Sequence, residues 1–526
     1  MHDLILRGGT VHDGLGSEPV TADVAVSGDR VAAVGRDLGA AQRVIDVTGL
    51  AVAPGFVDPH SHSDMVPLMA EPQPFKLLQG VTTEIAGNCG YSFAPLGEAA
   101  AAHGHDLLTD ISAGQPVVAR TFKEYLAEVA AAGPANNIGV LAGHNTLRLN
   151  VAGMEPGLPP GGLARMQGLL AEAFEAGAIG LSSGLIYPPG CYAGTGELVE
   201  LAKVAHAYGL PYATHLRNED RDLLAALGEA IEIGRRARVR VQISHCKAAG
   251  RAQHGSAGQL LAALRAARVS GVDIRGDVYP YLAGGTFLSA LLPNEAHAGG
   301  VHALRSRLLD PAGRAALLAA ATDPAAAAGT GFWREVGPGD VLVTSHANRP
   351  DAVGRTIALL AAEDAADPWD IACELIATDP SAGMVLTMMA EEDVRVLLAD
   401  PLTSIGSDNG MPYGLQHPRT WGCFPHFLGE YVRELGLVSL PEAIRKMTSA
   451  SAGQFGLTGR GWLGPGSVAD IAVFDPATIG HPGTYLTPDT RPAGVHCVLL
   501  GGQVAVADGS FTGIRAGQVV GPLMSL

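Results

Sequence analysis

The chain contains 526 residues, with 52 Asp and Glu against 35 Lys and Arg, which gives a formal net charge of −17. An acidic chain without a cluster of basic residues is not expected to bind nucleic acid or an anionic membrane. The length exceeds that of one ordinary domain and fits a large barrel that carries an accessory domain and an insertion.

The cysteines and the apolar segments indicate a cytoplasmic protein. The amino terminus has no basic flank followed by a long apolar core, and no apolar run reaches about 18 residues, the length of a membrane span. No feature of the sequence indicates an oligomeric state. Six cysteines without paired or repeating spacing argue against a disulfide framework and favour a reducing compartment; they are Cys89, Cys191, Cys246, Cys373, Cys423 and Cys497.

Short strands separated by turns are expected at both ends of the chain. Glycine and aspartate punctuate the apolar runs at the amino-terminal end, and the carboxyl-terminal end has the same pattern. These runs occupy residues 4–9, 23–26, 31–35, 469–474, 496–502 and 504–506. We predict that residues 1–52 and 458–526 form one small β-sandwich domain beside a central domain.

Strand-like and helix-like segments alternate in the central region, residues 53–457. Eight such repeats predict an α/β fold, a TIM (β/α)8 barrel, in which chemistry takes place at the carboxyl ends of the strands. The expected strands are residues 52–57, 81–86, 138–142, 179–183, 212–215, 239–245, 272–278 and 402–407. Expected helices include residues 121–132, 163–176, 222–238 and 256–270.

One connection is far longer than an ordinary barrel loop. Roughly 120 residues separate the seventh and eighth expected strands, and the segment at about 286–340 begins like a loop and continues as an Ala-rich helical region. We interpret this segment as an insertion over the barrel mouth that acts as a lid. A decorative subdomain without a catalytic role is the alternative.

A pair of histidines follows the first expected strand, in Gly-Phe-Val-Asp-Pro-His-Ser-His-Ser-Asp. In extended backbone, alternate side chains point the same way, so His60 and His62 converge on one point. Such a pair also occurs on ordinary half-buried strands, where each ring is simply hydrogen-bonded.

Further candidate metal ligands lie at the ends of later strands. His215 and His245 each end an apolar run, Cys89 follows one directly, and Asp408 follows the last. A buried cysteine is usually a small apolar residue, and an aspartate often caps a turn. The combined nitrogen, sulfur and oxygen donors nevertheless favour a zinc site, with Asp408 as a catalytic carboxylate.

Several motifs make the sequence resemble the N-acyl-D-amino-acid deacylases (D-aminoacylases) of the amidohydrolase superfamily. The resemblance covers nearly the whole chain, and Gly-Asn-Cys-Gly and His-Pro-Arg-Thr-Trp-Gly are its most specific motifs. The others include Gly-Val-Thr-Thr-Glu, Gly-His-Asn-Thr-Leu-Arg, Thr-His-Leu-Arg, Ser-His-Cys-Lys and Asp-Val-Tyr-Pro-Tyr.

The resemblance implies a zinc-dependent hydrolysis of N-acyl-D-amino acids to a carboxylate and a D-amino acid. It places the tightly bound zinc on Cys89, His215 and His245, and a second, weaker site on His60 and His62 with Cys89 shared. Asp408 would be the general base and acid. Contacts to the substrate carboxylate would be made by Lys247, Tyr279 and Arg419.

Two departures from the family pattern bear on substrate choice. Gly285 stands where the family usually has serine, and Cys246 replaces an expected histidine. They leave open a second hypothesis, that the protein is another zinc amidohydrolase, which acts on a different N-acyl compound, a cyclic amide or a lactone. A non-catalytic barrel that serves as a binding protein is the third hypothesis. By location, candidates for the pocket lining are Phe287, Leu288, Met411 and Trp421.

Overall fold

Eight parallel strands form the central barrel of the computed structural model, which describes all residues except 102–107, 109–111, 113–114, 324–330 and 522–526. The strands are β6 (Phe56–Asp58), β7 (Val81–Ala86), β8 (Asn137–Val140) with its continuation β9 (Ala142–Gly143), β10 (Leu181–Gly184), β11 (Tyr212–His215), β12 (Val241–Ile243), β13 (Ile274–Val278) and β17 (Thr403–Ile405). Each pairs with the next in this order. Seven of the eight predicted barrel strands are therefore confirmed, although several are shorter than expected, and the first differs as described below.

The last strand returns to the first, which closes the barrel. Beyond β17, Asn409 pairs in parallel with Ser61, and the Asp408 backbone N–H donates to the His60 carbonyl over 2.8 Å. Closure of a twisted parallel sheet brings the carboxyl ends of all its strands around one mouth. The segments that carry His60 and Asp408 thus become direct neighbours.

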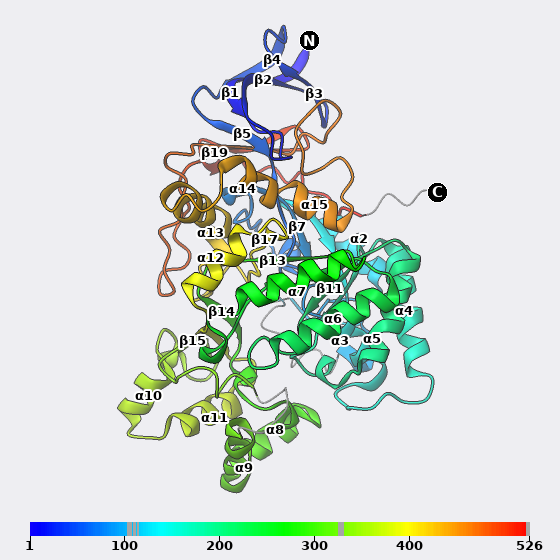
Figure 1. Ribbon diagram of the computed structural model, residues 1–526, viewed down its shortest axis with the longest axis vertical. Helices are drawn as coiled ribbons and strands as arrows, with labels where there is room; N and C mark the ends of the chain where they lie inside the picture. Colours follow the sequence, from blue (N-terminus) through cyan, green and yellow to red (C-terminus); the bar gives the residue numbers. More distant parts are fainter. Residues whose placement is uncertain (102–107, 109–111, 113–114, 324–330, 522–526) are drawn as a thin grey trace.

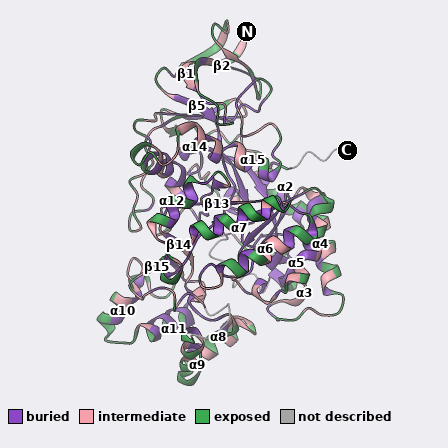
Figure 2. Ribbon diagram, in the orientation of Figure 1, coloured by how far each residue is buried: buried purple, intermediate pink, exposed green. Residues whose placement is uncertain are grey.

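Amphipathic helices cover the outside of the barrel (Figure 1). Their apolar sides face the strands, as the buried stripes in Figure 2 show. Thr121 caps α2 through a capping box with Glu124, which explains why the helix begins where its sequence predicts. The helices are α2 (Phe122–Ala132), α3 (His144–Ala152), α4 (Gly162–Ala176), α5 (Thr195–Ala207), α6 (Leu223–Ala237), α7 (Ala257–Val269), α12 (Glu391–Ala399), α13 (Arg419–His426), the π-helix η9 (Phe427–Glu434), α14 (Leu440–Met447) and α15 (Ser449–Phe455).

Strands from both ends of the chain join in one nine-stranded sheet beside the barrel. Its strands are β1 (His2–Val11), β2 (Val20–Ser27), β3 (Arg30–Gly35), β4 (Ala41–Asp46), β5 (Ala51–Pro54), β18 (Ile471–Phe474), β19 (Val495–Leu500), β20 (Gln503–Ala507) and β21 (Ser510–Phe511). The two ends meet where β5 pairs antiparallel with β18. Alternate residues such as Leu4, Leu6, Ile471 and Val473 belong to one apolar cluster. This pairing supports the proposed division into a small β domain and a barrel.

The strand predicted at residues 52–57 is two strands. β5 belongs to the small sheet and β6 to the barrel, and the chain changes sheets at Gly55. A Cβ at Gly55 would lie 2.2 Å from the Thr82 hydroxyl oxygen, so a larger residue would not fit. This close approach lets one apolar run serve two domains.

Between β13 and β17, the chain forms a subdomain at the barrel mouth. It contains the antiparallel sheet β14 (Ala283–Phe287), β16 (Gly383–Thr387) and β15 (Val341–Ser345), with α8 (Gly300–Leu309), α9 (Pro311–Thr322), α10 (Ile357–Asp364) and α11 (Pro368–Thr378). The insertion proposed at about 286–340 lies within these elements, and its residues 324–330 are outside the described part of the chain.

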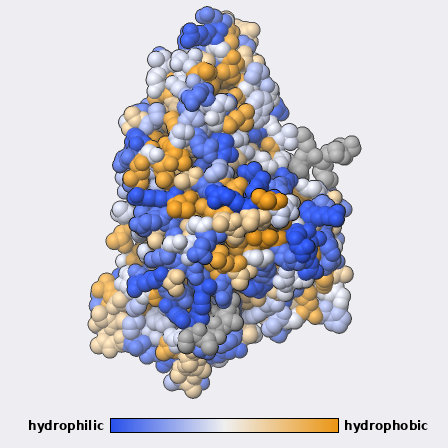
Figure 3. Space-filling view, in the orientation of Figure 1, coloured by the Kyte–Doolittle hydropathy of each residue, from blue (hydrophilic) through white to orange (hydrophobic). Residues whose placement is uncertain are grey.

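The visible face of the molecule intersperses hydrophilic and hydrophobic side chains (Figure 3). Among the described residues, no helix has both the length and the apolar character needed to cross a membrane.

Candidate metal centre and active site

All five predicted metal ligands lie at the carboxyl-terminal mouth of the barrel. His60 and His62 follow β6, Cys89 follows β7, His215 ends β11, and His245 follows β12. The predicted catalytic Asp408 follows β17. All but His62 are at least nine-tenths buried. The structure therefore brings together side chains that are separated by up to 348 positions in the sequence, from residue 60 to residue 408.

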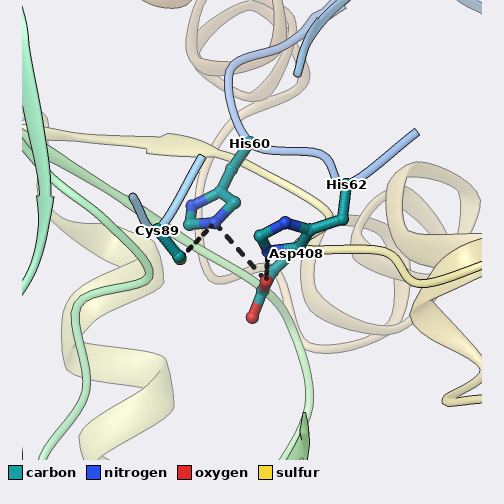
Figure 4. A group of neighbouring side chains, drawn as sticks. All are labelled: His60, His62, Cys89 and Asp408. Atoms are coloured by element: carbon teal, nitrogen blue, oxygen red, sulfur yellow. Dashed lines mark hydrogen bonds and ion pairs between the residues drawn. The ribbon is translucent and has the colours of Figure 1, made fainter. Parts of the chain in front are cut away.

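One group of candidate donors consists of His60, His62, Cys89 and Asp408 (Figure 4). Their ligand atoms lie within 4.8 Å of one another. Cys89 Sγ is 3.3 Å from His60 Nε2, and Asp408 Oδ1 is 3.4 Å from the same nitrogen and 3.2 Å from His62 Nε2. Such convergence of imidazole, sulfur and carboxylate donors is the arrangement that a metal ion requires.

Cys89 also belongs to a second group, with His215 and His245. Cys89 Sγ lies 3.5 Å from His245 Nε2, and the His215 and His245 ring centroids are 4.3 Å apart. His215 Nε2 lies 3.4 Å from Glu219 Oε2, and buried His215 Nδ1 has no hydrogen-bond partner among the described residues. A buried polar group is normally paired, so His215 supports a ligand role. The thiolate and imidazole donors fit zinc.

The backbone is left-handed at three residues of the site. The φ angle is 51° at Cys89, 33° at His245 and 48° at Asp408. Residues other than glycine rarely adopt this region, and such conformations gather at functional sites. Gly87 and Gly90, with φ of 75° and 80°, form the tight loop that presents Cys89. These turns direct the three side chains into the mouth.

The charges of the site stabilise ionised Cys89 and Asp408. Burial alone would raise the pKa of Cys89, but His60, His245 and His215 outweigh it and hold that pKa well below its ordinary value. Burial also opposes ionisation of Asp408. The neighbouring Arg419, His60 and His245 nevertheless hold the pKa of Asp408 well below its usual range. A thiolate is the form of cysteine that binds metal.

Buried carboxylates that the sequence analysis missed orient the candidate ligands. Asp277 Oδ1 lies 3.1 Å from His60 Nδ1 and accepts from the His245 backbone N–H over 2.8 Å, while Asp277 Oδ2 accepts from Gln242. Such partners fix the tautomer and direction of a ligating imidazole. The position of Asp277 near the end of β13 is the signal that could have identified it.

A second network holds the segment of the first two histidines in place. Asp58 accepts from the backbone N–H of His60 over 3.1 Å and from that of Ser407 over 2.9 Å. It also pairs with fully buried Lys76. Lys76 in turn donates to Asn409 Oδ1 over 2.7 Å, which ties both sides of the barrel closure together.

Lys247, a predicted substrate contact, belongs to a buried cluster with Glu219 and His245. Lys247 Nζ donates to Glu219 Oε2 over 3.0 Å and lies 2.9 Å from His245 Nδ1. Glu219 Oε1 lies 3.0 Å from the same His245 nitrogen. Glu219 was not predicted, although its position four residues after His215 placed it near the site. Its carboxylate links a predicted metal ligand with a predicted substrate contact.

Arg419 and Tyr279 lie beside each other at the site and carry buried polar atoms without a hydrogen-bond partner among the described residues. Arg419 Nη2 pairs with Asp408 Oδ2 at 2.9 Å, and the guanidinium lies 4.6 Å from the centre of the Tyr279 ring. Buried Arg419 Nε and Nη1 and the Tyr279 hydroxyl have no hydrogen-bond partner among the described residues. Guanidinium N–H donors and a hydroxyl that lack partners are suited to bind a carboxylate.

A cavity of about 130 Å³ connects these groups. Its lining includes every predicted site residue except fully buried His60. The inserted sheet contributes a wall through β14, β15 and β16. Of the residues predicted to line it, Phe287 and Met411 do so, whereas Leu288 is buried and Trp421 lines a separate surface pocket.

The two departures from the family pattern differ in their relation to the cavity. Gly285 lies in its wall, where a Cβ would meet Arg419 Nη2 at 3.7 Å, an ordinary contact. The neighbouring Thr286 hydroxyl lies 2.9 Å from the Tyr187 hydroxyl. Cys246 is buried and is not among the lining residues; its sulfur packs instead toward Gly276 and the Ile243 carbonyl.

Known proteins with similar sequences include a D-aminoacylase and an N-acyl-D-aspartate deacylase. The sequence matches the amidohydrolase family over residues 43–189 and 295–506. It is 38% identical to D-aminoacylase of Alcaligenes xylosoxydans xylosoxydans over 98% of this chain and 97% of that protein. It is also 38% identical to N-acyl-D-aspartate deacylase of the same organism, over 99% of this chain and 95% of that protein.

A solved structure of a similar protein has the same fold. N-acyl-D-glutamate deacylase from Bordetella bronchiseptica, crystallised with zinc and a phosphonate mimic of the tetrahedral intermediate, superposes with a TM-score of 0.83 at 32% identity. The match covers 98% of this chain and 99% of that one. The chain therefore belongs to the amidohydrolase family, within the group of the D-aminoacylases and N-acyl-D-amino acid deacylases.

Proposed function

We propose that this protein is a zinc-dependent hydrolase that converts N-acyl-D-amino acids and water into a carboxylate and a free D-amino acid. The observation that carries the proposal is the single cavity in which a Cys/His donor set, an ionised aspartate and the partly unpaired guanidinium of Arg419 meet. Full-length similarity to D-aminoacylase and to an N-acyl-D-aspartate deacylase supports the substrate class.

Cys89, His215 and His245 would hold the tightly bound zinc, and His60 and His62 would complete a second site with the shared Cys89. Bound zinc lowers the pKa of water from 15.7 to about 7 and polarises a carbonyl oxygen. The chain itself fixes the imidazoles through Asp277 and Glu219. These carboxylates keep the candidate ligands preorganised for the ion.

Asp408 would move the proton during hydrolysis. Its carboxylate lies beside His60 and His62 and is held ionised by its neighbours, so it would accept the proton of the attacking water. It then donates that proton to the amide nitrogen as the carbon–nitrogen bond breaks. General base and acid catalysis of this kind contributes about 10²- to 10⁴-fold to the rate.

Arg419 would bind the carboxylate of the substrate, with help from Tyr279 and Lys247. Arg419→Ala is expected to lower kcat/KM for an N-acetyl-D-amino acid relative to its C-terminal amide by roughly 10- to 100-fold. A charge-assisted hydrogen bond contributes about 1.5–3 kcal/mol, and each 1.4 kcal/mol is a factor of ten. The ratio of the two substrates cancels any effect on Asp408, which Arg419 also contacts. Equal losses on acid and amide would exclude the carboxylate contact.

The cavity favours an apolar side chain on the D-amino acid. The inserted subdomain contributes Phe287, Phe332, Met384 and Leu386 to its wall. Among the described lining residues, the only Lys and Arg side chains are Lys247 and Arg419, and each already has a buried carboxylate partner. A second substrate carboxylate would thus be buried without a cation of its own, which costs several kcal/mol.

Release of free amine from paired N-acetyl-D- and N-acetyl-L-amino acids tests the function. We expect hydrolysis of the N-acetyl-D-amino acids alone. The kcat/KM for N-acetyl-D-leucine or N-acetyl-D-methionine should be at least about 100-fold above that for N-acetyl-D-aspartate, because an unpaired buried charge is costly. Chelator-treated protein is the control and is expected to recover activity with zinc. No hydrolysis of any D substrate by the zinc-loaded protein would refute the proposed reaction and favour a lactone or cyclic amide.

A further inference from the structure

A second polar pocket lies at the opposite end of the barrel from the active site. Its lining includes Arg240, which immediately precedes β12, and Arg275, the second residue of β13. The same two strands lead at their other ends to His245 and Tyr279. Arg268 of α7 and Arg445 of α14 complete the set, and the pocket has a volume of about 570 Å³. In Figure 1, this region lies where α15 approaches α7 below the small β domain.

The pocket concentrates positive charge in a strongly acidic protein. Four arginines and one aspartate, Asp273, line it, which gives a local charge of 4 − 1 = +3 against −17 for the whole chain. Arg268 pairs with Asp273 at 2.9 Å, and Arg445 pairs with Glu442, which lies outside the lining. Arg240 donates to the carbonyls of Gly453 and Gly209.

Arg275 is the unusual member of this group. Among the described residues, its side chain has no hydrogen bond or ion pair, whereas the other three arginines are engaged. Burial, followed by the charges of Arg268 and Arg445, lowers its pKa below the ordinary value for arginine, and Asp273 offsets this only in part. A partly buried guanidinium with two cationic neighbours and no protein partner of its own favours the binding of an anion, which would supply the missing opposite charge.

We infer that this pocket binds a small multivalent oxyanion, such as inorganic phosphate or the phosphate group of a metabolite. The free Arg275 fork matches two oxygens of a tetrahedral anion, and Arg268 and Arg445 supply the surrounding charge. A dianion fits the local excess of charge better than a single carboxylate does. A nucleic acid is disfavoured because the overall charge of −17 repels a long polyanion.

Calorimetric titration of the zinc-loaded protein with inorganic phosphate, at constant ionic strength, tests this inference. Wild-type protein is expected to show one saturable site, and Arg275→Gln is expected to weaken it at least tenfold. Arg235→Gln is the matched control, because it removes the same charge from an exposed position on α6. That variant should bind phosphate like the wild type, and Arg275→Gln should keep the wild-type kcat/KM for the deacylase reaction.

Thermal unfolding adds a readout that a purely structural arginine would not give. In phosphate-free buffer, Arg275→Gln should unfold at the same or a higher temperature than the wild type, since it relieves repulsion from Arg268 and Arg445. Phosphate should then raise the Tm of the wild type more than that of the variant. Unchanged phosphate affinity in Arg275→Gln would overturn the inference. So would loss of phosphate binding in Arg419→Ala alone, because the anion would then occupy the active site.

Discussion

Asp408→Ala is expected to lower kcat by about 10²- to 10⁴-fold, the usual contribution of a general base and acid, while one zinc per chain remains bound. The Cys89, His215 and His245 group does not include Asp408, so the tight site keeps all its ligands. Asp408 does lie within 3.4 Å of His60 Nε2 and 3.2 Å of His62 Nε2. Its removal is therefore expected to weaken the second site.

Zinc content by elemental analysis and kcat on an N-acetyl-D-amino acid measure the two effects separately. Asp408→Asn is the closest control in shape, because the amide keeps a polar group beside Arg419 but cannot accept the proton. Both variants should have similarly low kcat. An Asp408→Ala protein purified without any zinc would show that this carboxylate holds the tight ion, which would make the division of roles wrong.

The repeated alternation of strand and helix made the barrel predictable, because parallel strands buried on both faces give continuous apolar runs between helical segments. The change of sheet within residues 51–58 was not predictable in this way. Val52 and Val57 are equally apolar, and only the three-dimensional approach of Gly55 to Thr82 separates the strands. The inserted sheet was also obscured, since β14 reads Ala-Gly-Gly-Thr-Phe and pairs with β16, about 100 residues later in the chain.

The candidate site was predictable where residue type and strand position coincide. His215, His245 and Cys89 each end or follow a strand, and the barrel then forces them together. Glu219 and Asp277 escaped notice because carboxylates are common, and their importance depends on burial beside His245 and His60. The pairing of Arg419 with Asp408 was equally hidden, since it depends on the fold of the segment between them.

Cys89→Ala is expected to remove both zinc ions and to reduce deacylase activity to background. Cys89 is the one residue common to the two donor groups, and its sulfur lies between His60 Nε2 at 3.3 Å and His245 Nε2 at 3.5 Å. The pKa of its thiol is held well below the ordinary value, so the protein loses an anionic ligand and not only a contact. The remaining imidazoles are neutral donors that bind zinc less tightly without it.

His62→Ala provides the matched comparison, because His62 belongs to only one of the two groups. This variant should retain one zinc per chain and a substantial part of the activity, provided that the Cys89, His215 and His245 group alone supports the reaction. Elemental analysis gives the number of ions per chain for each variant, and circular dichroism verifies that both remain folded. A Cys89→Ala protein that keeps one zinc and its activity would contradict the shared role of the thiolate, and an inactive one-zinc His62→Ala protein would show that the reaction needs both ions.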